Sequence, residues 1–77
     1  MAAEETVETL RPLMFSIAYR MVGSVADAED VVEGAFLRQQ RVLDGGAAIR
    51  SPKAYLSAVV TRLSIDHLRS ARTRRET

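Results

Sequence analysis

Apolar residues recur at the spacing of an α-helix in separate segments of this chain, and glycines interrupt the pattern between them. The first segment covers residues 9–22 and stops at Gly23, a residue type common just past the end of a helix. The second segment follows Ser24, which can cap a helix, and stops at the Gly45-Gly46 pair. These breaks predict two helices joined by a very short turn.

A third helix is predicted to begin at Ser51-Pro52, because serine is a common N-cap and proline fits the first helical position. It is predicted to run to about Arg72. No segment shows the period of two that marks a β-strand. The chain is therefore predicted to be all-α, a compact three-helix bundle with a helical domain over residues 9–72. Residues 1–8 are expected to add a frayed or helical extension, and residues 73–77 a solvated basic tail.

The predicted core consists of apolar side chains at helical spacing, with a glutamine and a histidine among them. They are Leu10, Met14, Ile17, Ala18 and Met21 in the first helix, Ala28, Val31, Val32, Ala35, Phe36, Gln39, Val42 and Leu43 in the second, and Leu56, Val59, Val60, Leu63, His67 and Leu68 in the third. Gly34 interrupts the second stripe at a cost of up to about 1 kcal/mol relative to alanine. Either a neighbouring helix packs closely against Gly34 or the second helix carries that cost.

Composition excludes several classes of function for this 77-residue chain. Without cysteine and with a single histidine, it predicts no disulfide and no metal site, and it excludes most catalytic constellations. The same histidine, His67, is expected at the edge of the core and not as a ligand. No apolar run is long enough to span a membrane, and the acidic first residues are unlike a secretory leader. We therefore expect a cytoplasmic, non-catalytic binding domain that needs no cofactor.

The two halves of the chain carry opposite charges. Residues 1–45 contain four basic and eight acidic side chains, whereas residues 46–77 contain seven basic and two acidic ones. Such a distribution suits two partners of opposite charge, although the halves could also simply attract each other.

The second and third helices contain strings that resemble a known family. Residues 27–38 read DAEDVVEGAFLR and residues 51–69 read SPKAYLSAVVTRLSIDHLR. In this order and at this distance, they resemble region two of bacterial sigma factors of the extracytoplasmic-function (ECF) class. The preceding LRPLMFSIAYRMVGS, residues 10–24, resembles a subgroup that often carries a SnoaL-like C-terminal domain.

The resemblance implies a transcription-initiation module with two surfaces. The second helix would bind the clamp helices of the largest subunit of RNA polymerase. The loop and the third helix would recognise the promoter −10 element, hold a flipped base of its non-template strand and help to open the duplex. An anti-sigma factor is a further implied partner. The implied polymerase-binding residues are Asp30, Glu33, Leu37 and Gln40, and the implied DNA-binding residues are Arg50, Ser51, Lys53, Tyr55, Arg62, Arg69 and Arg72.

The chain departs from the family pattern at several positions. The family usually has Gln-Glu where this chain has Glu33-Gly34, so one acidic contact is missing at Gly34. It often has tryptophan near Gln40 and asparagine at the position of Arg62. The chain is also too short to contain region four, which reads the −35 element.

Simpler interpretations stay open for several of these residues. The acidic residues of the second helix could be a solvated face, and the glycine-rich segment an ordinary loop. Tyr55 could pack in place of stacking on a base, and Asp66 could pair with Arg69 along the helix. Two other functions also remain: a polymerase- or anti-sigma-binding module without DNA readout, or a helix-turn-helix regulator, against which the long loop counts.

Overall fold

The computed structural model describes residues 6–76, with side chains through Arg74. Three α-helices make up the fold: α1 spans Val7–Val22, α2 spans Val25–Asp44 and α3 spans Pro52–Glu76. No strand occurs within these described residues. The prediction of an all-α, three-helix chain is confirmed.

Side-chain caps and glycines set the ends of the helices. The Thr6 hydroxyl accepts a hydrogen bond from the Thr9 backbone N–H, and the Thr9 hydroxyl oxygen accepts one from the Thr6 N–H in return. Gly23 ends α1 with a φ of 75°, a left-handed conformation that suits glycine. Ser24 then caps α2 by accepting from the Asp27 N–H at 3.3 Å, and Ser51 accepts from the Ala54 N–H at 3.2 Å.

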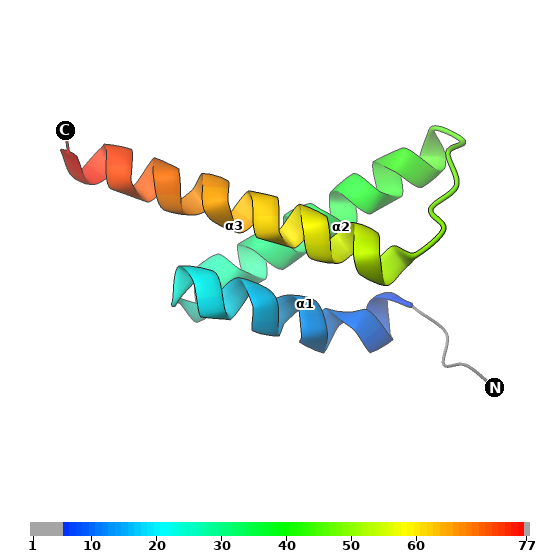
Figure 1. Ribbon diagram of the computed structural model, residues 1–77, viewed down its shortest axis with the longest axis horizontal. Coiled ribbons are helices and arrows are strands. Elements are labelled where there is room, and N and C mark those ends of the chain that lie inside the picture. The colour runs from blue at the N-terminus through cyan, green and yellow to red at the C-terminus, as the bar shows by residue number, and fades with distance from the viewer. Residues whose placement is uncertain (1–5, 77) are drawn as a thin grey trace.

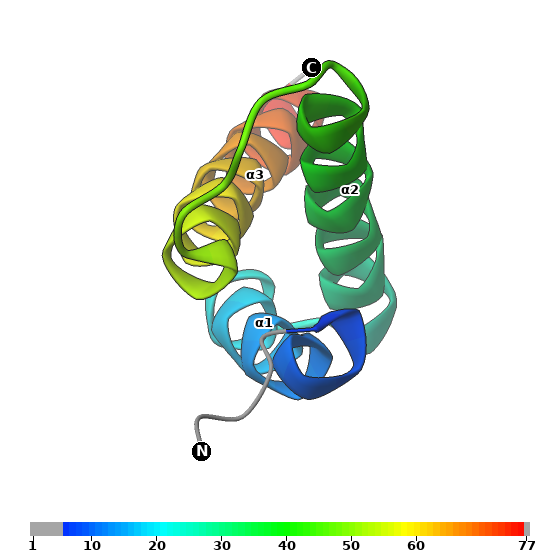
Figure 2. The ribbon, with the colours of Figure 1, turned by 90° about the vertical axis from the view of Figure 1, so that its right-hand side faces the viewer.

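The three helices surround a central core, and each packs against the other two (Figure 2). α1 and α3 run in the same direction and α2 runs against them (Figure 1). The C-terminal end of α3 extends beyond the neighbouring ends of α1 and α2 (Figure 1). The core residues are Leu10, Met14 and Ala18 of α1, Ala28, Val31, Val32, Ala35 and Phe36 of α2, and Leu56 and Val60 of α3.

The observed core is narrower than the predicted one. Every core residue of the structure was predicted, but several other predicted residues only flank the core or lie at the surface. Ile17, Val59 and Leu63 are partly buried against the core, whereas Leu43 and Leu68 are exposed. A three-helix bundle of this size buries only one narrow stripe on each helix, so residues at the edges of the stripes keep contact with water.

The described helices also extend beyond their predicted ends. α1 begins at Val7 and not at Thr9, because Thr6 caps it. α3 continues past Arg72 through Glu76, so residues 73–76 of the predicted solvated tail are helical, and Thr73 and Arg74 are exposed. Arginine is a good helix former, and cations near a helix C-terminus interact favourably with its dipole. The predictions for residues 1–5 and 77 fall outside the described residues.

A close contact between α2 and α3 explains the glycine in the middle of α2. A β-carbon placed on Gly34 would lie 3.3 Å from Cδ1 of Leu63, tighter than ordinary van der Waals contact. Of the two alternatives for Gly34, close packing of a neighbouring helix is the one observed.

Candidate nucleic-acid and polymerase interfaces

The four predicted polymerase-binding residues lie on one exposed side of α2. Asp30, Glu33, Leu37 and Gln40 are all exposed, and Leu37 has 53% of its surface accessible. Their spacings of three, four and three residues place them along a single side of a helix. We call these four residues the acidic strip. An exposed apolar side chain next to two carboxylates on an otherwise polar helix face offers a contact for a partner with complementary charge.

Two members of the acidic strip already interact within the chain. Glu33 Oε2 lies 3.5 Å from Nη1 of Arg11 on α1, so one cation is held beside the strip. The Arg11 guanidinium also lies over the Phe36 ring, 5.0 Å from its centroid. Gln40 Nε2 donates to Asp44 Oδ1 at 2.8 Å, one turn along α2. Arg11 has no counterpart in the sequence prediction, because a contact between two helices cannot be read from spacing along one of them.

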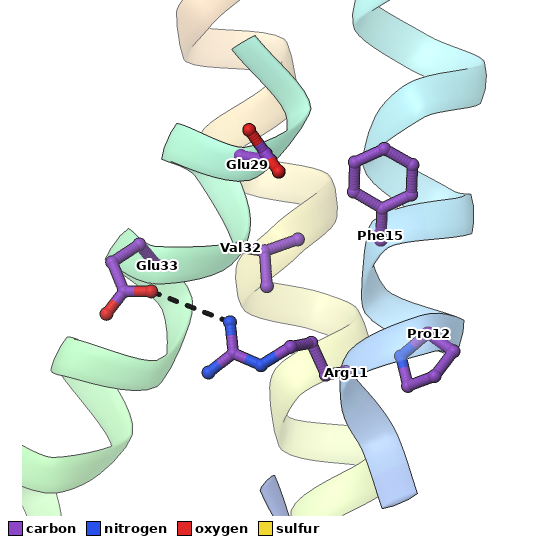
Figure 3. Close-up of a pocket in the computed structure, with 6 residues that line it drawn as sticks. All are labelled: Arg11, Pro12, Phe15, Glu29, Val32 and Glu33. Atoms are coloured by element: carbon purple, nitrogen blue, oxygen red, sulfur yellow. Dashed lines mark ion pairs between the residues drawn. The ribbon is translucent and has the colours of Figure 1, made fainter. Parts of the chain in front are cut away.

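Beside the acidic strip, a groove of about 490 Å³ separates α1 from α2 (Figure 3). Its lining residues are Arg11, Pro12 and Phe15 of α1 and Glu29, Val32 and Glu33 of α2. Phe15 stacks on Tyr19, with ring centroids 5.9 Å apart, and Tyr19 is 45% exposed. The groove therefore combines an apolar floor with carboxylates along one edge.

The predicted base-binding loop joins α2 to α3 and consists largely of exposed residues. Gly46 adopts a φ of 92°, which only glycine takes readily. Arg50 and Ser51 are exposed, and Ser51 is engaged as the cap of α3. Three well-formed grooves of the described residues are lined by the helices and not by this loop. The base pocket predicted for this loop therefore stays a prediction that rests on its exposed backbone and on Arg50.

The predicted DNA-contacting arginines lie on the exposed surface of α3. Arg62, Arg69 and Arg72 are all exposed, and their spacings of seven and three residues keep them within reach of one side of the helix. Arg62 Nε lies 3.4 Å from Asp66 Oδ1, so Asp66 pairs with Arg62 and not with Arg69. Lys53, at the start of α3, is exposed as well.

Tyr55 and His67 both take part in packing. Tyr55 is partly buried against the core, in agreement with the packing interpretation. His67 Nε2 lies 3.1 Å from Asp27 Oδ2, which connects α3 to the first turn of α2.

Among the described residues, histidine and acidic side chains do not gather in groups of three that could hold a metal ion. The described helices also include none with the length and apolar character that a membrane span requires.

Comparison with known proteins places this arrangement in a family. The Sigma-70 region 2 family matches residues 6–74. The chain is 50% identical over 70 residues to the ECF RNA polymerase sigma factor SigJ of Mycobacterium tuberculosis, a match that covers 91% of this chain and 22% of SigJ. It is 31% identical over 68 residues to the ECF RNA polymerase sigma factor SigW of Bacillus subtilis, which covers 88% of this chain and 36% of SigW.

The chain thus spans well under half the length of these relatives. No solved structure matches it significantly. The family match nevertheless covers nearly all the described residues and all three helices. The chain belongs to the Sigma-70 region 2 family.

Proposed function

We propose that this domain docks on the RNA polymerase core through the acidic strip of α2 and takes part in recognising and opening the promoter −10 element. The observation that carries this proposal is the exposure of Leu37 next to the carboxylates of Asp30 and Glu33 on one side of α2. The names of the relatives, ECF RNA polymerase sigma factors, agree with it.

The clamp helices of the largest polymerase subunit are the proposed partner. A coiled coil can bury the apolar surface of Leu37, while basic side chains at its edges approach Asp30 and Glu33. Charged residues at the rim of an interface govern the association rate and specificity more than the affinity. Leu37 is therefore expected to supply most of the binding energy and the two carboxylates the orientation.

DNA is the proposed ligand of the loop and of α3. Arg62, Arg69 and Arg72 would contact phosphates, and Arg50, Ser51 and Lys53 would lie near a flipped base of the non-template strand. Each phosphate contact on a single strand contributes about 0.7 to the slope of log K against log salt.

A second function has specific support. Ser51 is engaged as a cap, Tyr55 packs against the core and Arg62 is paired with Asp66. These contacts favour an interaction module that binds polymerase or an anti-sigma factor without reading DNA. We also propose that the protein acts in the cytoplasm and that it belongs to the subgroup that often carries a SnoaL-like C-terminal domain.

The docking half of the proposal is tested by titrating the chain with a clamp-helix fragment of bacterial RNA polymerase. Asp30→Arg is expected to weaken binding by at least tenfold, about 1.4 kcal/mol. Glu8→Arg is the matched control, because Glu8 is an exposed carboxylate on α1 outside the acidic strip. Equal effects of the two substitutions, or no binding by the unaltered chain at high micromolar concentration, would contradict docking through α2.

The DNA half is tested by fluorescence anisotropy with single-stranded and duplex −10-like oligonucleotides. The single strand is expected to bind more tightly, and Arg69→Ala to reduce the salt slope by about 0.7. Arg20→Ala, an exposed arginine on α1, should leave the slope unchanged. Intact polymerase binding without any DNA binding would instead establish the interaction module.

A further inference from the structure

We propose that the groove between α1 and α2 receives a lysine or arginine side chain from the protein that docks on the acidic strip, with Glu29 binding its charged end. This inference rests on the proposed function, because it assigns a second contact to the same partner. The sequence analysis assigned no binding role to Glu29 or to Phe15.

The shape and chemistry of the groove favour a long basic side chain. Figure 3 shows Phe15 of α1 and Glu29 of α2 on opposite sides of the groove, with Val32 on the same side as Glu29. Lysine and arginine bury an aliphatic stem on apolar surface while their charged end stays with polar groups. In this groove, Val32 and Pro12 can contact the stem, the Phe15 ring can face the cation, and Glu29 can pair with it.

The charge at the edge of the groove identifies Glu29 as the receiving carboxylate. Arg11, the one cation of the lining, is already 3.5 Å from Glu33 and lies over the Phe36 ring. Glu29 is exposed and forms no ion pair with any residue that the structure describes. The edge of the groove therefore keeps one uncompensated negative charge, which attracts a cation and repels an acidic occupant.

The groove lies next to the acidic strip, so a single partner can contact both surfaces. Glu33 belongs to the acidic strip and also lines the groove, so the two surfaces are continuous. On the other side of α2, Gly34 offers no side chain and Leu63 of α3 packs against it. Within the acidic strip, Glu33 thus faces the groove beside α1, whereas Asp30 lies on the side of α3.

The test measures the affinity of the 77-residue chain for the clamp-helix fragment by calorimetry. Glu29→Gln is expected to weaken binding about fivefold, whereas Glu8→Gln should change it less than twofold. Glu8 is an exposed glutamate on α1 that does not line the groove, so this control removes the same charge elsewhere. Circular dichroism at 222 nm verifies that both variants remain folded.

A second readout locates the contact independently of affinity. In NMR titrations with the same fragment, the ring signals of Phe15 and the methyl signals of Val32 are expected to shift, because both residues line the groove. If Asp30→Arg abolishes binding but Glu29→Gln behaves like Glu8→Gln and the Phe15 signals do not move, the inference is overturned while docking on the strip stands. If the unaltered chain does not bind the fragment, the proposed function and this inference both fail.

Discussion

Removal of the Ser64 hydroxyl is expected to stabilise the protein. Ser64 on α3 has no accessible surface, and its Oγ has no hydrogen-bond partner among the described residues. Other hydroxyls of the same helix behave differently: Ser57 donates to the Lys53 carbonyl at 2.7 Å and Thr61 to the Ser57 carbonyl at 2.8 Å. Ser64 therefore carries a desolvation cost that no hydrogen bond offsets.

The magnitude follows from three contributions. A buried hydroxyl without a partner costs about 1–3 kcal/mol in protein mutational data. The void left by the missing oxygen atom destabilises the variant by about 0.3 kcal/mol, at about 24 cal/mol per Å³ of cavity. Alanine also has a helix propensity more favourable than that of serine by about 0.5 kcal/mol. Ser64→Ala should thus raise the free energy of unfolding by about 1–3 kcal/mol, and each kcal/mol raises Tm by about 4–8 °C in a domain of this size.

Urea and thermal unfolding followed by circular dichroism at 222 nm provide the measurement. Ser70→Ala is the matched control, because Ser70 is an exposed serine on α3 and its replacement reports helix propensity alone. The difference between the two variants isolates the buried hydroxyl. A Ser64→Ala variant less stable than Ser70→Ala would refute the reasoning, since the hydroxyl would then have a hydrogen-bond partner in solution.

Three further outcomes are expected from single substitutions. Gly34→Ala should stabilise the protein by about 0.5 kcal/mol in urea unfolding, because a helix-propensity gain of about 1 kcal/mol exceeds the cost of displacing partly buried Leu63; a net loss would show that Leu63 cannot move. Ser24→Ala should cost about 1 kcal/mol in the same assay by removing the cap of α2, and an unchanged midpoint would contradict the cap. Arg11→Met should tighten binding to the clamp-helix fragment about threefold, because it frees the Glu33 carboxylate from its ion pair. The control Arg20→Met should leave the affinity unchanged. Equal changes would indicate an effect of net charge only.

Local sequence signals predicted most of the fold. Gly23 and Ser24 placed the turn between α1 and α2, and Ser51-Pro52 placed the start of α3, because caps depend on a few neighbouring residues. The helical spacing identified every residue of the core. Membership of the Sigma-70 region 2 family confirms that the chain is a relative of ECF sigma factors and not an enzyme.

Contacts between helices were beyond the reach of sequence reasoning. Arg11 and Glu33 are 22 positions apart, and Asp27 and His67 are 40 apart, so no spacing rule connects them. Their proximity depends on how the helices rotate and cross. The same limitation explains why the groove beside the acidic strip was not predicted, because its six lining residues come from two helices.

The extension of α3 past its neighbours gives the two ends of that helix different local stabilities. Leu56 and Val60 hold the first half of α3 in the core, so the amides there should exchange with solvent deuterium only through unfolding of the whole domain. The terminal turns, which extend beyond α1 and α2 in Figure 1, can open on their own and should exchange much faster. A phosphate bound beside Arg72 would then slow exchange selectively in those turns, so part of any DNA-binding free energy would be used to order the helix end.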